Sequence, residues 1–382
     1  MILILLIQTN KKVNNEWELK TRDFLKKMKN IKKIFISPRS SLRRAIEIIQ
    51  KGGAGIALIV DTQERLIGTV TDGDIRRAIL HKIKLNEKIG RILKDKPFNY
   101  PNSVAVSVDT HREDILRLMK EKLLRHIPLL DKHNKVVDLV LLSEFVEEEI
   151  PLPLSAVVMA GGRGQRLHPL TNDIPKPMLP LDNRPIMECI VEQLRKSGIT
   201  KVNISTNYKS EIIVNHFGNG DKFGVEIDYI NEDQPLGTAG ALGLMAPPDK
   251  PVLVINGDIL TQLNFCAMFD FHRSYKAMMT VGVKKYEMSI PYGVIETEDV
   301  MITGLVEKPL QEFIVNAGIY LIEPSVCQYI PKGSYFNMTD LVNALIKAKH
   351  RVISFPIQEY WLDVGHHASY NQAKIDVQNG KV

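Results

Sequence analysis

A glycine-rich and cationic loop follows a short apolar run near the middle of the chain. The stretch MAGGRGQRLHPLTNDIPKPMLPL (residues 159–181) holds three glycines, two arginines, one lysine and four prolines. Backbone N–H groups freed by glycine can converge on phosphate oxygens, and the guanidinium groups of Arg163 and Arg166 add charged donors. Prolines on both sides hold Lys176 in an extended segment. The loop therefore predicts a binding site for a phosphorylated ligand.

Two common phosphate-binding motifs do not fit this loop. The dinucleotide pattern G-x-G-x-x-G fails because its third glycine is absent. The Walker A pattern G-x-x-x-x-G-K-[ST] occurs nowhere in the chain. The loop must therefore belong to another class of phosphate site.

Two aspartates that lie more than 100 residues apart could bind a metal ion together. Asp258 follows the apolar run PVLVIN, and Asp363 lies in WLDVGHHASY. Each alone fits a helix cap or a turn, whereas Mg²⁺ prefers one or two carboxylates together with phosphate oxygens. If the fold brings the two together, they predict Mg²⁺ bound to a triphosphate. The neighbouring His366 and His367 lack the further ligands that zinc would need.

A sheet is needed to position these side chains. SAVVMA (155–160) and PVLVIN (251–256) are short apolar runs typical of buried parallel strands. In an α/β fold, ligands bind beyond the carboxyl ends of such strands. Because the glycine loop and Asp258 both follow a strand, we expect an α/β domain with its site at that edge.

The glycine loop and the PKPMLP segment together resemble the motif G-G-x-G-x-R-L-x-P-L-T…P-K-P-M-L-P of the sugar-1-phosphate nucleotidyltransferases. Further motifs of that family follow in its order across residues 155–370. The resemblance implies a Rossmann-like (GT-A-like) domain over residues 154–382 with a mixed, mostly parallel sheet. It also implies that a nucleoside triphosphate and a sugar 1-phosphate react to give an NDP-sugar and pyrophosphate. Gln165 replaces the family's usual threonine, which we expect to affect affinity rather than chemistry.

The resemblance also assigns roles to the motif residues. It implies four catalytic residues, of which the two aspartates would bind Mg²⁺: Arg166, Lys176, Asp258 and Asp363. The implied nucleotide contacts come from the glycine loop, from NEDQPLGTAGAL (231–242) and from the residue before Asp258: Ala160, Gly161, Gly162, Arg163, Gly164, Gln165, Gln234, Gly237, Thr238 and Gly257. The segments PYGVIE, VEKP and NAGIYLI supply the implied sugar-phosphate contacts: Gly293, Glu307, Lys308 and Asn316.

The choice of nucleotide and sugar stays open at this stage. The QPLGTAGAL loop looks most like that of guanylyltransferases of the GDP-mannose pyrophosphorylase type. The order of domains looks closest to bacterial enzymes that make a GDP-hexosamine, GDP-glucosamine above all, for nonulosonic acid pathways. The alternatives are UTP or dTTP with a hexose 1-phosphate, GTP with mannose 1-phosphate, and a regulatory subunit that binds nucleotides without activity. Because every implied catalytic charge is present, the sequence favours an active enzyme.

The first part of the chain contains a repeat with an offset of 70 residues. Residues 37–80 align without a gap to residues 107–150, and both copies predict a helix, two strands and a closing helix. In the first helix, the pattern predicts one buried face formed by Leu42, Ala45, Ile46 and Ile49. The stretch GTVTDGDIRRAIL resembles the CBS domain family, whose tandem copies form a Bateman module. We expect the first copy at about 31–85, the second at about 90–150, and a connector at PLPL (151–154).

The CBS resemblance implies a ligand site in the first copy. Thr71 and Asp74 match the family positions that contact an adenosyl ligand, which suggests an adenine nucleotide or a pathway product as a regulator. In the second copy, Asp138, Leu141 and Glu144 replace the matching glycine, threonine and aspartate. The alternative is that Asp74 only caps the helix that follows it.

Composition limits the remaining functions. The net charge of +6 arises entirely within residues 1–33, which hold nine basic and three acidic residues, so the rest of the chain is neutral. This distribution argues against nucleic-acid binding. The apolar start MILILLI is too short to span a bilayer, and three scattered cysteines suggest the cytoplasm. We expect a homodimer or a higher homo-oligomer. We also expect an N-terminal extension over residues 1–30, where either Met1 or Met28 is the natural start.

Overall fold

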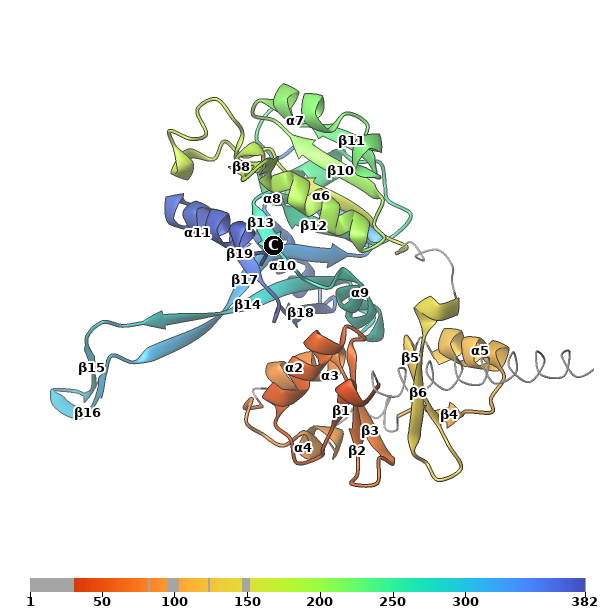
Figure 1. Ribbon diagram of the computed structural model, residues 1–382. Coiled ribbons are helices and arrows are strands. Elements are labelled where there is room, and N and C mark those ends of the chain that lie inside the picture. The colour runs from red at the N-terminus through yellow and green to blue at the C-terminus, as the bar shows by residue number, and fades with distance from the viewer. Residues whose placement is uncertain (1–30, 82, 95–102, 123, 146–151, 382) are drawn as a thin grey trace, which may run out of the picture. The chain divides into compact units, whose positions relative to one another are not determined.

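The computed structural model describes residues 31–81, 83–94, 103–122, 124–145 and 152–381 (Figure 1). The N-terminal extension expected over residues 1–30, with both candidate start methionines, lies outside them. The chain divides into two compact units, residues 1–150 and 151–382, and each is described separately below. Within the described residues, no helix has the length and apolar character that crossing a membrane requires.

The first unit contains the predicted repeat, because the first helix and the two strands after it begin and end 70 residues apart in the two copies. Each copy has a three-stranded sheet in which the first pair of strands is parallel and the second is antiparallel. The first copy consists of η1 (Lys32–Ile34), β1 (Phe35–Ile36), α2 (Leu42–Gly52), β2 (Ile56–Val60), β3 (Leu66–Thr71), α3 (Asp72–Leu80) and α4 (Ile89–Lys94). The second consists of β4 (Val106–Ser107), α5 (Arg112–Lys122), β5 (His126–Leu130), β6 (Val136–Leu141) and η2 (Leu142–Phe145).

The buried residues of helix α2 can be compared with the face that its apolar pattern predicts. Its N-terminus is capped by the Ser41 hydroxyl, which accepts a hydrogen bond from the backbone N–H of Arg44 at 3.3 Å. The buried face consists of Leu42, Ala45, Ile48 and Ile49. Ile46, the remaining residue of the predicted face, is half-buried and packs against the same hydrophobic cluster, and Ile48 joins the buried face although the pattern did not name it.

The second unit is built on a seven-stranded mixed sheet of order β11-β10-β7-β12-β17-β14-β18. Four neighbouring strands are parallel: β11 (Glu226–Asn231), β10 (Lys201–Thr206), β7 (Ser155–Met159) and β12 (Val252–Asn256). The other three are β17 (Leu310–Ile322) and β14 (Met279–Ser289), which each run antiparallel to a neighbour, and β18 (Val352–Pro356), which runs parallel to β14. The predicted α/β fold with a mixed, mostly parallel sheet is confirmed.

Both faces of this sheet are buried, as the apolar runs predict. Successive residues of β7 alternate between two cores, since Ala156 and Val158 belong to one hydrophobic cluster and Val157 to the other. The first cluster packs under α6 (Ile186–Lys196), α7 (Ser210–Phe217), α9 (Phe265–Ser274) and α11 (His367–Gln378), and the second under α10 (Met338–Lys347) (Figure 1).

Short elements complete the second unit. Three small antiparallel pairs join β8 (Pro180–Leu181) to β9 (Arg184–Pro185), β13 (Ile259–Thr261) to β19 (Trp361–Asp363), and β15 (Gly293–Glu298) to β16 (Met301–Glu307). The single-turn helices are η3 (Gln165–Leu167), η4 (Lys176–Met178), η5 (Asp221–Phe223), α8 (Gly237–Gly240), η6 (Ala241–Leu244) and η7 (Pro324–Tyr329).

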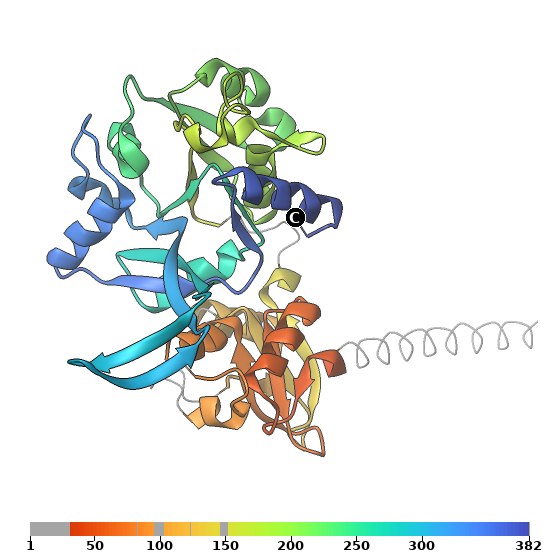
Figure 2. The same cartoon turned by 90° about the vertical axis from the view of Figure 1, so that its left-hand side faces the viewer.

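A long hairpin leaves the sheet of the second unit. Strands β14 and β17 pair from Met279 opposite Ile322 to Ser289 opposite Leu310, with an irregularity between Val281 and Val283. Beyond it, the two strands run out of the sheet and carry β15 and β16 at their far end, as Figures 1 and 2 both show. We call residues 284–315 the arm.

In the first unit, the two copies meet at a half-buried histidine. The side chain of His126 in β5 lies against the backbone that precedes β2, with its Nε2 3.6 Å from the position that a Cβ on Gly55 would take. Desolvation lowers the pKa of His126 to about 4, although a hydrogen bond with the backbone of Ala54 acts in the opposite direction. His126 is therefore neutral in the folded protein at physiological pH.

We predict that the first unit loses stability as the pH falls from 6.5 towards 4. The folded-state pKa of His126 lies below the ordinary value of 6.5, so the unfolded chain binds the proton more readily in that window. Hydrogen exchange of β2 and β5 amides in the full chain measures the effect. His126→Gln should flatten the pH dependence, whereas His111→Gln, at an exposed histidine of the same unit, should follow the wild type. Equal pH dependence in all three proteins would contradict this account.

Candidate active site

The four parallel strands of the second unit end at one edge of the sheet. Met159 at the end of β7 lies opposite both Ser205 in β10 and Asn256 in β12. The glycine loop therefore begins beside the strand that leads to Asp258. Loops that follow adjacent parallel strands converge at this edge, which is where α/β proteins bind their ligands.

The two parts of the glycine-loop motif pack against each other. Gly164 has a left-handed backbone with a φ of 63°, and a Cβ there would lie 2.9 Å from side-chain carbons of both Lys176 and Thr171. The buried Thr171 hydroxyl donates a hydrogen bond to the Gly164 carbonyl at 2.9 Å. Only glycine meets both the conformational and the steric requirement. The loop is therefore held against η4, which Lys176 begins. The extended segment expected there was wrong, since only the flanking Pro175 and Leu179 have extended backbone.

The structure brings Lys176, Asp258 and Asp363 together. Asp258 immediately precedes β13, whose residue Ile259 pairs with Asp363 in β19, and the N–H of Val364 donates to the Asp258 carbonyl at 3.0 Å. The Lys176 ammonium forms an ion pair with Oδ2 of Asp258. Two carboxylates and one buried ammonium thus occupy the edge to which the glycine loop leads.

Arg166 lies close enough to Asp363 for its charge to matter. Although Asp363 is exposed, desolvation by the surrounding protein raises its pKa, and so does the negative charge of Asp258. Lys176, Arg166 and His366 act in the opposite direction without reversing the shift. Arg166 and its neighbour Arg163 are exposed and form no ion pair with the described residues, so both guanidinium groups are available to an anion.

The two aspartates fit a magnesium ion whose other ligands come from a phosphorylated substrate. Oδ1 of Asp258 is buried and has no hydrogen-bond partner among the described residues, a costly state that a cation would relieve. Those residues contain no group of three or more histidine, cysteine or acidic side chains placed to hold a metal. Two carboxylates with substrate oxygens suit Mg²⁺, whereas a closed zinc site would need further protein ligands.

The predicted base loop is anchored to the start of α10. Gly237, with a φ of 79°, begins α8 beside the carbonyl of Phe336. The Thr238 hydroxyl accepts a hydrogen bond from the N–H of Met338 at 2.9 Å, and the N–H of Thr238 donates to the Asn337 side chain. The Thr238 side chain thus holds the loop in place, whereas Gln234 is exposed beside it.

Glu232 is a buried carboxylate that the sequence reasoning missed. It follows β11 at the same edge, and one of its oxygens accepts a hydrogen bond from the N–H of Leu236 at 2.9 Å. The other would lie 2.7 Å from a Cβ on Gly161, so it touches the glycine loop. Desolvation raises its pKa, against hydrogen bonds from Leu236 and Ser205. The sequence pattern that could have identified Glu232 is an acidic residue directly after a strand, at the start of the predicted base loop.

The four predicted sugar-phosphate residues lie in two places. Asn316 lies where β17 reaches the edge of the sheet, and its side chain bonds to Tyr320 and to the N–H of Gly318. Gly293, Glu307 and Lys308 lie on the arm, which leads away from β13 and β19 (Figure 1). The structure therefore does not bring these three together with the aspartates of the same chain.

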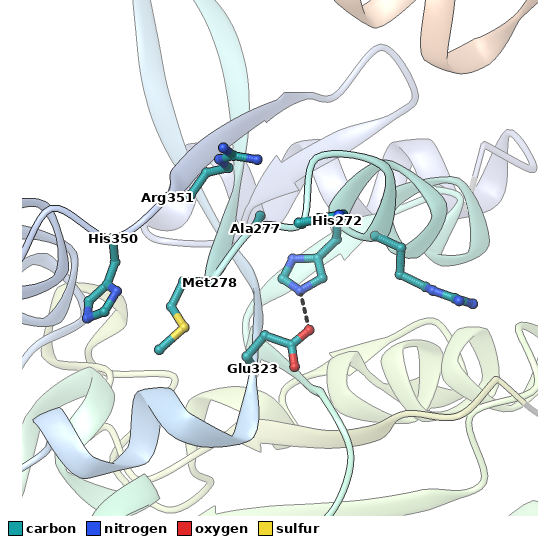
Figure 3. Close-up of a pocket in the computed structure, with 8 residues that line it drawn as sticks. His272, Ala277, Met278, Glu323, His350 and Arg351 are labelled. Atoms are coloured by element: carbon teal, nitrogen blue, oxygen red, sulfur yellow. Dashed lines mark hydrogen bonds and ion pairs between the residues drawn. The ribbon is translucent and has the colours of Figure 1, made fainter. Parts of the chain in front are cut away.

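A cavity of about 460 Å³ lies elsewhere in the second unit (Figure 3). It is lined by the end of α9, by residues 276–278 before β14, by Glu323 after β17 and by the residues before β18, and it contains none of the predicted site residues. Its buried His272 bonds to Thr280 and to Glu323, at 2.8 and 3.0 Å. His350 bonds to Tyr329. The two histidines thus have partners within the fold, and we assign no function to this cavity.

In the first unit, Thr71 and Asp74 form a capping box at the start of α3. Asp74 accepts a hydrogen bond from the N–H of Thr71 at 2.9 Å and pairs with Arg77 at 2.6 Å. In the second copy, Glu144 accepts from the N–H of Leu141 at 3.1 Å, so the capping bond survives the change of residues. Helix capping thus accounts for Asp74, and ligand binding at this position stays a prediction.

Comparison with known proteins gives matches for both units. Residues 155–380 match the nucleotidyl transferase family, and residues 22–81 and 98–150 match the CBS domain family. A D-glycero-alpha-D-manno-heptose 1-phosphate guanylyltransferase of Aneurinibacillus thermoaerophilus is 32% identical over 59% of this chain and 99% of its own length. A mannose-1-phosphate guanyltransferase of Schizosaccharomyces pombe is 34% identical over 57% of this chain, which spans 62% of that relative. A solved structure of a putative glucose-1-phosphate thymidylyltransferase from Bacillus anthracis is 26% identical, with a TM-score of 0.48 over 58% of this chain and 94% of that one.

We predict that Asp363→Asn raises the melting temperature of the free protein at neutral pH. The raised pKa of Asp363 means that its ionisation opposes folding, so removing the charge stabilises the fold. The gain should shrink as the pH falls through the raised pKa and vanish below the ordinary value of 3.8, because the carboxyl is then protonated in both states. Calorimetry of the free protein across this pH range measures the effect.

Asp376→Asn is the matched control with the opposite sign. Desolvation acts to raise the pKa of the buried Asp376, but hydrogen bonds from Lys381, Tyr360 and Gln372 lower it overall. Ionisation of Asp376 therefore favours folding above the ordinary pKa, and its loss should lower the melting temperature at neutral pH. If Asp363→Asn and Asp376→Asn shifted the melting temperature in the same direction, the opposite pKa shifts assigned to these two aspartates would be refuted.

Proposed function

This chain belongs to the nucleotidyl transferase family, and we propose that it transfers the guanylyl group of GTP to a sugar 1-phosphate with Mg²⁺. The observation that carries the proposal is the meeting of Lys176, Asp258 and Asp363 at the edge where the glycine loop begins. Glucosamine 1-phosphate is the first candidate acceptor, on the resemblance to enzymes that join CBS domains to a guanylyltransferase. Mannose and heptose 1-phosphates, which the named relatives use, are the alternatives.

In the proposed reaction, a phosphate oxygen of the sugar 1-phosphate attacks the α-phosphorus of GTP in line. The bond from the α-phosphorus to the oxygen bridging to the β-phosphate breaks, and pyrophosphate leaves with that electron pair. Such a transfer needs little covalent help, so positioning and charge neutralisation supply most of the rate. The glycine-loop amides, Arg163 and Arg166 would hold the β- and γ-phosphates and favour departure of pyrophosphate.

Lys176 would change partners during the reaction cycle. In the free protein its ammonium neutralises Asp258, and both are partly withdrawn from water. Mg²⁺, when bound at Asp258 and Asp363, would supply the positive charge that these carboxylates and the phosphates require. Lys176 could then turn its hydrogen bonds to the α-phosphate and the incoming phosphate, where two like charges approach each other.

Glu232 supports guanine as the base. A buried carboxylate only accepts hydrogen bonds when ionised, and it lies between the glycine loop and the predicted base loop. Guanine presents two adjacent donors on one edge, the ring N–H and the amino group, whereas uracil and thymine present one. The names of the relatives, which are guanylyltransferases, support the same choice. The charged residues that the resemblance implies for catalysis and for phosphate binding are all present, which favours an enzyme over an inactive regulatory subunit: Arg166, Lys176, Asp258, Lys308 and Asp363.

For the CBS pair we propose a regulatory role, with an adenine nucleotide or the pathway's end product as the ligand near Thr71 and Asp74. A cytoplasmic location would suit the three free cysteines. Turnover measured with and without AMP, ATP and GDP-sugar decides the regulatory role. If none of these nucleotides changes turnover, the CBS pair has a structural or dimerising role instead.

We predict pyrophosphate release from a grid of nucleoside triphosphates and sugar 1-phosphates to be highest with GTP and glucosamine 1-phosphate. Release should require Mg²⁺, and Asp258→Asn and Lys176→Ala should lower turnover about 10²–10³-fold, as loss of a comparable electrostatic contact does. Both variants should keep the unfolding profile of a folded protein. Normal turnover in either variant would refute the assigned site, and a preference for UTP or dTTP would refute the base assignment.

We predict that Glu232→Gln lowers the preference for GTP over UTP about 10–100-fold in kcat/KM, because an amide cannot accept from both donors of guanine. Glu226→Gln, at an exposed glutamate at the start of β11, the strand that precedes Glu232, is the control and should leave the preference unchanged. The ratio is the informative readout, since a residue that only braces the loops would slow both nucleotides equally. An unchanged ratio in Glu232→Gln would show such a bracing role.

A further inference from the structure

The arm leaves the sheet at the same edge as the proposed active site. Val283 lies opposite Asn316, and from there the paired strands continue to Ser289 opposite Leu310. Six residues of strand from Asn316 to Leu310 span roughly 20 Å. Figures 1 and 2, taken from directions 90° apart, both show the arm projecting from the body of the unit. Its far end is therefore held away from the aspartates of its own chain.

The arm exposes more apolar surface than a hairpin in water can support. Of the 22 large hydrophobic side chains that are exposed among the described residues, 12 lie between residues 286 and 314. They include Tyr292, Val300 and Ile302, which are 74%, 92% and 64% exposed. At roughly 100 Å² for each of the 12 side chains, the arm exposes about 1,000 Å² of apolar surface. One partner in a stable dimer contributes an area of this order to the interface.

Both faces of the ribbon are exposed. Nearly all residues of β15 and β16 are accessible, with only Val294 and Gly304 half-buried. An isolated two-stranded hairpin is marginally stable in water. The arm of this chain therefore requires a covering surface that its own unit does not provide.

The arm also carries a preformed polar cluster at its bend. Gly293 pairs with Glu307, whose carboxylate would lie 3.0 Å from a Cβ on Gly293. The next residue, Lys308, has a left-handed backbone with a φ of 44°, which is costly for a residue with a side chain. Its N–H donates to the carbonyl of Tyr292, and its ammonium is exposed. Strain of this kind is retained where the resulting side-chain position is used.

The polar cluster of the arm has an ammonium and a carboxylate that would suit the substrate of the proposed active site. The cations at the sheet edge already have roles in the proposed reaction. Arg163 and Arg166 would hold the β- and γ-phosphates, and Lys176, paired with Asp258 in the free protein, would be shared between the α-phosphate and the incoming phosphate. The incoming sugar 1-phosphate brings a second negative phosphate and several hydroxyl groups. A further ammonium and a carboxylate that accepts from hydroxyls would suit it, and Lys308 with Glu307 has that chemistry.

We propose that two copies of this chain exchange arms, so that Glu307 and Lys308 of each copy complete the sugar-phosphate site of the other. This inference rests on the proposed function. A second copy is the occupant that explains both observations, because one two-fold contact covers the apolar arms and brings each polar cluster to a site that lacks it. The arm is then both the dimer contact and part of the substrate site.

Complementation between two inactive variants tests the proposal. Asp258→Asn disables the site of its own body, and Lys308→Ala disables the arm, so each alone should lose turnover by 10²-fold or more. When both full-length variants are co-expressed, a mixed dimer that exchanges arms has one intact site, and random pairing should restore about a quarter of wild-type activity. An arm that serves its own chain leaves a defect in every site, so mixtures without activity would overturn the proposal.

Two further measurements keep the arm proposal separate from the proposed function. Ile302→Glu should lower turnover at least tenfold by weakening the arm contact, whereas Ile346→Glu, at a similarly exposed isoleucine of α10, should not. In the wild type, β15 and β16 amides should exchange slowly at high protein concentration and fast on dilution, whether or not the chain is active on the substrates tried. Exchange that is independent of concentration would overturn the proposal even if the reaction is as proposed.

Discussion

The organisation of the second unit depends on one balance of charges at the edge of its sheet. Two aspartates that are 105 residues apart in the chain meet there because β13 and β19 pair beside the end of β12. Their negative charges repel each other, and the pKa of Asp363 is raised as a result of desolvation and of Asp258. Lys176 offsets part of that repulsion without removing it. The free protein thus keeps a site that is poised for additional positive charge.

The surrounding structure maintains this balance by packing rather than by further charges. Gly164 lets the glycine loop pack directly against Lys176 and Thr171, and the Thr171 hydroxyl holds the loop by its hydrogen bond to the Gly164 carbonyl. Substitution at such a position would displace the lysine and the loop together, because neither has space to move separately. This mutual dependence explains physically why the glycine loop and the proline-flanked lysine occur as one motif.

Much of the fold and the local motifs could be predicted from the sequence, since they depend on neighbouring residues. The 70-residue offset of the repeat and the parallel strand before the glycine loop follow from local patterns. The extended segment expected around Lys176 was wrong, because Lys176 begins the single turn η4. Helix α2 shows the limit, because the pattern did not name Ile48, which is buried, and included Ile46, which is only half-buried. Glu232 was missed because its importance arises from Gly161 and Leu236, which only the folded sheet places around it.

The direction of the arm could not be predicted from the sequence for a related reason. From the sequence we identified the motif residues of this region but not the pairing of β14 with β17 or of β15 with β16, and the bend between the two pairs is a tertiary property. For residues 284–315 the question is which surface covers the apolar side chains, and the sequence of one chain does not state whether that surface belongs to itself or to a copy. If arms are exchanged, the sugar-phosphate site exists only in the dimer. Turnover would then fall on dilution although each chain stays folded, and the oligomeric state would become part of the catalytic mechanism.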